Sequence, residues 1–224
     1  MKISIIIPAY HERQNLANLV NRLEIMARYG HEIIVVNGDI TDDITQGMLD
    51  SGVTVIHADK GRAKQMNAGA RQASGIIYWF LHADSDLLHP LEHYLHFISI
   101  LNRNQWGRFN LKIDASAFIY RIIETMINFR SALTGISTGD QSLFIHKDLF
   151  DRVGGFTDIE IMEDIDMSRK LKKISRPVIA RTCLITSARR WQNGGVLRTI
   201  LLMWKLRLYY FFGVAPEKLA KMYD

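Results

Sequence analysis

The stretch Ile3-Ser4-Ile5-Ile6-Ile7-Pro8 begins an alternation of strands and helices that decides the fold. A short β-rich run that ends at a proline is typical of a buried parallel strand. Similar runs follow at 32–36, 53–56 and 76–81, with helical periodicity at 15–28 and 63–73 and a further helix expected from about Thr41. This spacing predicts an α/β fold with a mostly parallel sheet, in which ligands bind beyond the carboxyl ends of the strands.

Strands and helices alternate less regularly in the second half of the chain. We expect helices near 90–101, 118–133 and 164–173, and extended segments at 107–113 and 142–146. No internal repeat, low-complexity tract or linker interrupts the 224 residues. A length of roughly 100–200 residues per domain then predicts a single domain over residues 1–224.

Composition and charge exclude several classes of protein. Hydrophobic residues make up 48% and charged residues 23%, which excludes a disordered, collagenous or coiled-coil chain. The lone Cys183 excludes an internal disulfide and predicts a reducing, cytoplasmic compartment. Residues 169–224 carry 13 Lys and Arg against 2 Asp and Glu, whereas residues 1–168 carry 15 against 21. The basic end favours an anionic partner or surface, while the acidic remainder disfavours nucleic-acid binding by the whole chain.

Membrane-related signals are weak. The N-terminal apolar run is too short for a signal peptide. The stretch Val196–Ala215 has about the length of a membrane span but contains three basic residues. Arg198 and Lys205 share one helical face and Arg207 points the opposite way, so we expect a packed helix. Peripheral contact with the inner face of a membrane stays open.

Acidic residues follow the fourth predicted strand. Asp84 and Asp86 are spaced so that both carboxylates can reach one hard cation, and Mg²⁺ or Mn²⁺ takes such oxygen ligands together with substrate phosphates. The alternative is that the two side chains cap the next helix or form an Asx turn. For His82, which lies beside them, a structural role is favoured over a catalytic one.

Three further groups are candidates for chemistry. Glu163-Asp164 at a helix start can supply a general base, or can simply complement the helix dipole. The basic residues of Lys60–Lys64 lie at the start of a helix, where backbone N–H groups can bind phosphate. The alternative, a solvated basic first turn, is unfavourable because positive charge opposes the helix dipole at that end. Arg189-Arg190 is a candidate diphosphate clamp, with a surface basic patch as the alternative.

Several established motifs are missing from the sequence. It contains no GxGxxG after the first strand, no GxxxxGK[ST], no GxSxG and no Cys/His metal-ligand spacing. The sequence therefore lacks the motifs that identify classical dinucleotide-binding proteins, P-loop proteins, α/β-hydrolases and zinc sites.

Taken in order, these segments resemble the family 2 glycosyltransferases of the GT-A fold. The resemblance rests on Ser4–Glu12, on Glu32–Asp42 with Asn37 where the family has aspartate, on Gly61–Gly69, on Asp84–Asp86 and on Glu163-Asp164. Thr138–Gln141, Gly154–Phe156, Met162–Asp164 and Ser187–Trp191 are most similar to the radical SAM/selenodomain-associated transferase type 2 group, which is linked by its naming to arsenosugar biosynthesis. Ser187 stands where processive synthases carry glutamine, so polymer synthesis is not expected.

The resemblance implies a metal-dependent, inverting transfer of a sugar from a nucleotide-diphosphate sugar to an acceptor hydroxyl. It implies a nucleotide-sugar-binding half (1–104), an acceptor and catalytic half (105–193) and basic C-terminal helices (194–224). The implied donor-binding residues are Pro8, Tyr10, Glu12, Asn37, Asp39, Gly61, Lys64, Asn67, Asp84, Arg189, Arg190 and Trp191. Asp84 and Asp86 would hold Mg²⁺ or Mn²⁺, Asp164 with Glu163 would be catalytic, and Asp140 and Gln141 would face the acceptor. The alternatives are a nucleotidyltransferase of the same fold and a non-enzymatic module that binds anionic lipid or nucleic acid.

Overall fold

A computed structural model describes residues 1–41 and 52–223 of the chain. The helix expected from about Thr41 falls largely outside these residues. The strands are β1 (Ile3–Ala9), β2 (Glu32–Asn37), β3 (Val53–His57), β4 (Ile77–Phe80), β5 (Ser85–Leu87), β6 (Trp106–Asp114), β7 (Leu143–His146) and β8 (Val178–Ser187). The helices are α1 (Arg13–Leu23), α2 (Ile25–Arg28), α3 (Arg62–Gln72), α4 (Leu91–Ser99), α5 (Phe118–Thr134), α6 (Lys147–Arg152), α7 (Glu163–Lys172), α8 (Arg189–Gly194), α9 (Val196–Phe211) and α10 (Pro216–Tyr223).

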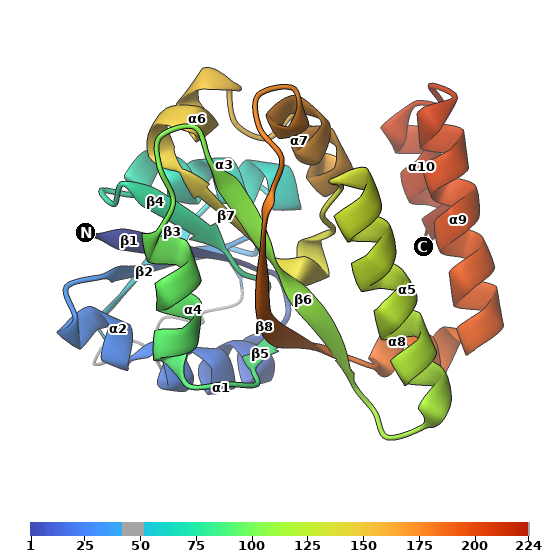
Figure 1. The fold of residues 1–224 in the computed structure, drawn as a ribbon, viewed down its shortest axis with the longest axis horizontal. Coiled ribbons are helices and arrows are strands. Elements are labelled where there is room, and N and C mark those ends of the chain that lie inside the picture. The colour runs from blue at the N-terminus through green and yellow to red at the C-terminus, as the bar shows by residue number, and fades with distance from the viewer. Residues whose placement is uncertain (42–51, 224) are drawn as a thin grey trace.

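The strands form one mixed sheet in the order β3-β2-β1-β4-β7-β6-β8-β5. The pairs β3–β2, β2–β1, β1–β4 and β6–β8 are parallel, and the pairs that involve β7 or β5 are antiparallel. The α/β architecture with a mostly parallel central sheet is therefore confirmed, and its continuous parallel part is formed by β1–β4 of the N-terminal half (Figure 1). Sequence reasoning did not identify β5 or β8, and the single helix expected at 15–28 is divided into α1 and α2 at Glu24.

Helices cover both faces of the sheet because β1 is apolar on both sides. Ile3, Ile5 and Ile7 pack into one core with α1 and α4, whereas Ile6 packs into the opposite core with α3, α6 and α7. At Gly69 in α3, an added Cβ would lie 2.4 Å from Ile6 Cγ2, so only glycine allows this close approach of helix to strand. A strand that is buried on both faces requires a three-layer arrangement, with helices above and below the sheet.

The basic C-terminal segment is helical, as expected. Helices α9 and α10 pack against each other at the edge of the molecule, beside α5 and the start of α7 (Figure 1). Their small core contains Leu206 and Leu219 together with Met162 and Ile165. None of the helices formed by the described residues has the length and hydrophobicity needed to cross a bilayer.

Candidate active site

The segment that leaves β4 brings two side chains into one cavity. His82 and Asp84 alternate along the chain, and both line a cavity of about 340 Å³. Asp86 lies in β5, outside this cavity, where its carboxylate forms an ion pair with Arg22 of α1 at 2.5 Å. Asp84 and Asp86 both line a second cavity, of about 260 Å³, beside Asp114. Of the expected pair, Asp84 lines this cavity and Asp86 does not, and the residue beside Asp84 in the cavity is His82.

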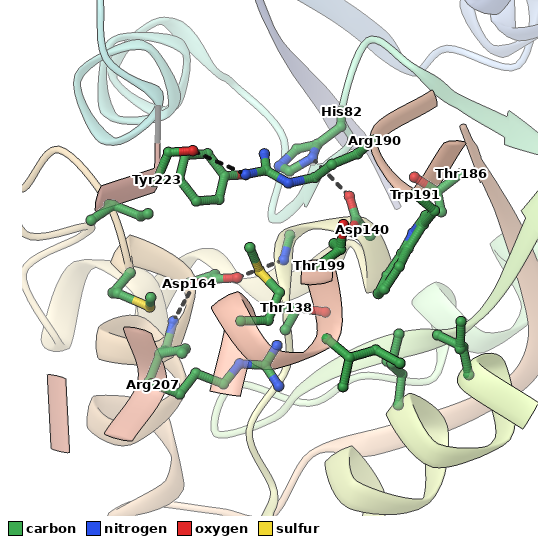
Figure 2. Close-up of a pocket in the computed structure, with 18 of the residues that line it drawn as sticks. His82, Thr138, Asp140, Asp164, Thr186, Arg190, Trp191, Thr199, Arg207 and Tyr223 are labelled. Carbon is green, nitrogen blue, oxygen red and sulfur yellow. Dashed lines mark hydrogen bonds and ion pairs between the residues drawn. The ribbon is translucent and has the colours of Figure 1, made fainter. Parts of the chain in front are cut away.

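A tight turn at Gly139–Gln141 lies directly beside this segment and also lines the cavity. Asp140 Oδ1 lies 3.7 Å from His82 Nδ1 (Figure 2). Burial acts to raise the pKa of the Asp140 carboxyl, but contact with His82 outweighs it and lowers that pKa. A Cβ at Gly139 would lie 2.2 Å from His82 Cε1, so the turn and the imidazole are packed in direct contact.

The acidic pair at the start of α7 completes this part of the cavity. Asp164 accepts hydrogen bonds from the backbone N–H of Gly139 at 2.8 Å and of Ile165 at 2.7 Å. Glu163 is 4% exposed and lies 3.8 Å from Arg62. Desolvation raises the pKa of Glu163, and the neighbouring Asp164 adds to the effect. Asp164 is the less buried of the two acids, which makes it the better placed to meet a substrate.

Helix α8 supplies cationic and aromatic groups. Arg189, Arg190 and Trp191 all line the cavity. The Arg190 guanidinium lies 3.5 Å from the centre of the Tyr223 ring and donates a 3.3 Å hydrogen bond to the backbone carbonyl of that residue (Figure 2). Arg189 forms an ion pair with Glu12 at 3.1 Å, which ties α8 to the start of α1.

The remaining wall is apolar and was not anticipated from the sequence. It is formed by α5 and α9, including Met126, Met203 and Trp204. Arg207 of α9 also lines the cavity, and desolvation lowers its pKa. Within the described residues, no hydrogen bond or ion pair to the Arg207 guanidinium is found, although Asp164 acts on it electrostatically. A helical wheel of α9 predicts that Arg207 points away from Arg198 and Lys205. It does not predict that Arg207 lines a cavity.

The other expected donor-binding residues lie at the ends of β1 and β2, outside this cavity. Pro8 and Asn37 are buried, Tyr10 is exposed, and Lys60 lies 4.3 Å from the centre of the Tyr10 ring. Asp39 is 3.5 Å from His11. Gly61 and Lys64 lie at the start of α3, where Lys64 faces Asp59 at 3.9 Å. Glu12, through Arg189, connects this group to the cavity.

Two expected site residues have structural partners instead. The Asn67 side chain donates to the backbone carbonyl of Phe156 at 2.8 Å and accepts from the N–H of the same residue at 3.0 Å. Gln141 is fully buried and caps its own turn together with Thr138. Both side chains thus stabilise loops next to the cavity, and neither lines it.

The donor set suits a divalent cation that shares its ligands with a substrate. No grouping of three or more His, Cys, Asp or Glu side chains that could hold a metal ion occurs within residues 1–41 and 52–223. Asp84 has no hydrogen bond or ion pair to its carboxylate in this part of the chain, and desolvation raises its pKa. A partly buried, unpaired carboxylate favours a cation beside it, and Mg²⁺ commonly takes only one or two protein carboxylates plus phosphate oxygens.

Comparisons with known proteins show the family of this chain. A model of a protein family described as glycosyl transferase family 2 matches residues 4–132, more than half of the chain. The chain belongs to glycosyl transferase family 2. The family model ends within α5, so it covers His82 and Asp84 but not the 139–141 turn, the acidic pair or α8 and α9.

Relatives of this family 2 chain include a dolichol-phosphate mannosyltransferase of Pyrococcus furiosus. The two are 35% identical over 99 residues, which is 41% of this chain and 28% of the relative. The chain therefore spans less than a third of the length of this curated relative.

Solved structures of glycosyltransferases share the fold. The mannosyltransferase PcManGT from Pyrobaculum calidifontis, in complex with GDP-Man and Mn²⁺, superimposes with a TM-score of 0.66 at 16% identity, covering 98% of this chain and 68% of that one. TarS of S. aureus in complex with UDP-GlcNAc gives a TM-score of 0.63 at 18% identity, covering 84% and 58%. These similarities establish the GT-A-like fold of the family 2 chain.

Proposed function

We propose that this family 2 chain transfers a sugar from a nucleotide-diphosphate sugar to an acceptor hydroxyl in the cavity between Asp84 and Asp164. The observation that carries the proposal is the convergence of three distant segments, because Asp84, Asp140 and Asp164 all line one cavity that also contains arginines. Two fold neighbours are complexes with GDP-Man and with UDP-GlcNAc, which supports a donor of this class.

Asp164 is the proposed general base. The acceptor oxygen attacks the anomeric carbon as the bond from that carbon to the phosphate oxygen breaks, and Asp164 takes the acceptor proton. Attack on the face opposite the leaving group inverts the anomeric centre. The hydrogen bonds from Gly139 and Ile165 fix the orientation of the Asp164 carboxylate before substrate arrives.

Positive charge is available for the departing nucleoside diphosphate. Arg189 and Arg190 at the cavity rim are the proposed contacts for the phosphates, since a guanidinium matches phosphate oxygens in pairs. Asp84, with Asp140 or His82 near it, would hold Mg²⁺ or Mn²⁺, which supplies charge neutralisation of the diphosphate when bound. The neighbour PcManGT contains Mn²⁺, in support of this cofactor.

The donor base would bind at the ends of β1 and β2. Tyr10, Asn37 and Asp39 lie there, at the carboxyl ends of parallel strands where α/β proteins place their ligands. The Arg189–Glu12 ion pair joins this region to the cavity, so one extended donor can span both. Gly61 and Lys64, at the start of α3, would lie along the diphosphate.

The narrower affiliation is also part of the proposal. Four segments are similar to the radical SAM/selenodomain-associated transferase type 2 group. Three of them, Thr138–Gln141, Met162–Asp164 and Ser187–Trp191, contribute residues to the cavity, and Gly154–Phe156 lies outside it. That concentration at one site is expected if the group shares an acceptor-binding geometry.

The test is a donor screen. The chain is incubated with GDP-mannose, UDP-GlcNAc or UDP-glucose, with and without Mn²⁺, and release of nucleoside diphosphate is measured. We expect slow, metal-stimulated release from one donor, with the β anomer of the free sugar formed first from an α-linked donor, as resolved by NMR. Pyrophosphate release from a sugar 1-phosphate and a nucleoside triphosphate would instead indicate a nucleotidyltransferase and contradict the proposal.

A further inference from the structure

The apolar residues of α5 and α9 are exposed in two continuous stripes. On α5 the exposed residues recur at helical spacing: Phe118, Ile119, Ile122, Met126, Phe129 and Leu133. On α9 and just beyond it they are Leu197, Leu201, Trp204, Leu208, Phe211 and Phe212. Exposed apolar patches of this extent on a single face mark an interaction surface.

The two stripes meet at the mouth of the cavity. Met126 belongs to the α5 stripe and Trp204 to the α9 stripe, and both also line the cavity. The two helices lie side by side at the edge of the molecule, away from β1–β3 (Figure 1). A partner that covers the stripes would therefore sit directly over the entrance to the proposed acceptor site.

Charge favours an anionic partner at this face. Helix α9 contains no acidic residue, and the only acid of α5, Glu124, is buried and paired with Arg121 at 2.8 Å. Arg198 and Lys205 are exposed and flank the apolar stripe of α9 on one side. Arg207, whose position argued against an interfacial helix, lines the cavity instead. The two exposed charges of α9, Arg198 and Lys205, therefore lie on the same side of its apolar stripe.

We infer that the α5–α9 face docks on the surface of an anionic lipid bilayer. Apolar side chains along a helix, with a tryptophan among them and basic residues at the border, insert to the depth of the headgroups while lysine and arginine reach the lipid phosphates. This inference extends the proposed function, because a docked face would present the cavity to an acceptor hydroxyl carried by a lipid.

Trp204 provides a direct reporter of docking. It is 59% exposed, whereas Trp79 and Trp106 are fully buried and Trp191 faces the cavity. On addition of vesicles that contain phosphatidylglycerol, we expect a blue shift of the emission and quenching by brominated acyl chains. Pure phosphatidylcholine vesicles and high salt should weaken both signals, and Trp204→Phe should remove them while co-sedimentation with vesicles persists.

A charge placed on the stripe tests the surface itself. Leu201→Glu should lower partitioning onto the anionic vesicles by at least about tenfold, since it removes apolar area and adds a like charge. The matched control is Ile100→Glu, at a similarly exposed residue at the end of α4, which should partition as the wild type does.

Three results would overturn the inference: no partitioning of the wild type, equal loss in both variants, or a dimer in light scattering that Leu201→Glu converts to a monomer without any vesicle binding. The last result would identify a second copy as the occupant. Neither vesicle assay needs a sugar donor, so failure here leaves the donor screen unaffected, and failure of the donor screen leaves docking unaffected.

Discussion

Gly139 donates its backbone N–H to Asp164 at 2.8 Å, and this bond joins two segments 25 residues apart in the chain. The same turn carries Asp140, which faces His82. Asp164, the turn and the segment after β4 thus form one connected wall, in which the position of each acidic group depends on its neighbours.

The role of Asp164 as base predicts a selective loss of turnover. Asp164→Asn keeps an acceptor for the Gly139 N–H but cannot take a proton, and loss of a well-placed base typically costs about 10²–10⁴ in rate. Donor binding, followed by calorimetry, should stay near the wild-type value. Asp166→Asn is the matched control, because that residue lies on the same helix but bonds Thr157 and Lys170. Equal activity in Asp164→Asn and wild type would remove Asp164 from the mechanism.

The contact of Gly139 with His82 predicts a coupled pair of substitutions. In Gly139→Ala, the added methyl would overlap the imidazole and force the ring or the turn to move, at a cost of about 1–3 kcal/mol in the free energy of unfolding. In the double variant His82→Ala/Gly139→Ala, space is available and part of that cost should be recovered.

Urea unfolding of the two single variants and the double variant measures this coupling. Additive effects would show that the ring and the turn are independent.

The network at Glu32 predicts an acid-dependent stability away from the active site. Desolvation acts to raise the pKa of Glu32, but hydrogen bonds from Ser4, from Ser74 and from Lys2 outweigh it and lower the pKa to about 2. A carboxyl with a folded pKa below its unfolded value stabilises the fold above the unfolded pKa, and that contribution is lost as pH falls through the folded pKa.

Glu32→Gln should therefore lower the free energy of unfolding at pH 7 by roughly 1–2 kcal/mol after allowance for solvent screening. The difference from wild type should shrink below about pH 4.5 and vanish near pH 2, as followed by urea unfolding across this range. Glu24→Gln, at a residue whose exposed side chain makes an i,i+4 pair with Arg28, is the control and should be nearly neutral. A difference that grows toward low pH would contradict the assigned direction.

Much of the fold was predictable because its first half is a parallel sheet. Ile3–Ile7 and the run at 32–36 are buried on both faces and read as continuous apolar stretches. In contrast, two of the buried residues of β8 are the polar Thr182 and Thr186, and β5 is three residues long, so neither strand gives a strong signal. Pairing partners of such strands are set by tertiary contacts.

The sequence indicated the acidic residues of the candidate site, but not the side chains that contact them. Asp84 and Asp164 could be singled out because carboxylates at strand and helix ends are recognisable in sequence, whereas Asp140 was expected only from the family resemblance. The ion pair of Asp86 with Arg22, a residue 64 positions away on α1, could not be predicted from the sequence. Likewise, the placement of His82 against Asp140 and of Arg207 in the cavity depends on packing between distant elements.

The most direct test of the central claim is calorimetric titration of GDP and UDP, each with and without Mn²⁺, into wild type, Asp84→Asn and Asp86→Asn. We predict that one nucleotide binds the wild type in a Mn²⁺-dependent manner. Asp84→Asn should weaken it about 10- to 100-fold, since a charged contact is lost, and Asp86→Asn should bind as the wild type does. Binding that Mn²⁺ does not affect, or that Asp84→Asn leaves unchanged, would contradict the placement of the donor diphosphate at Asp84.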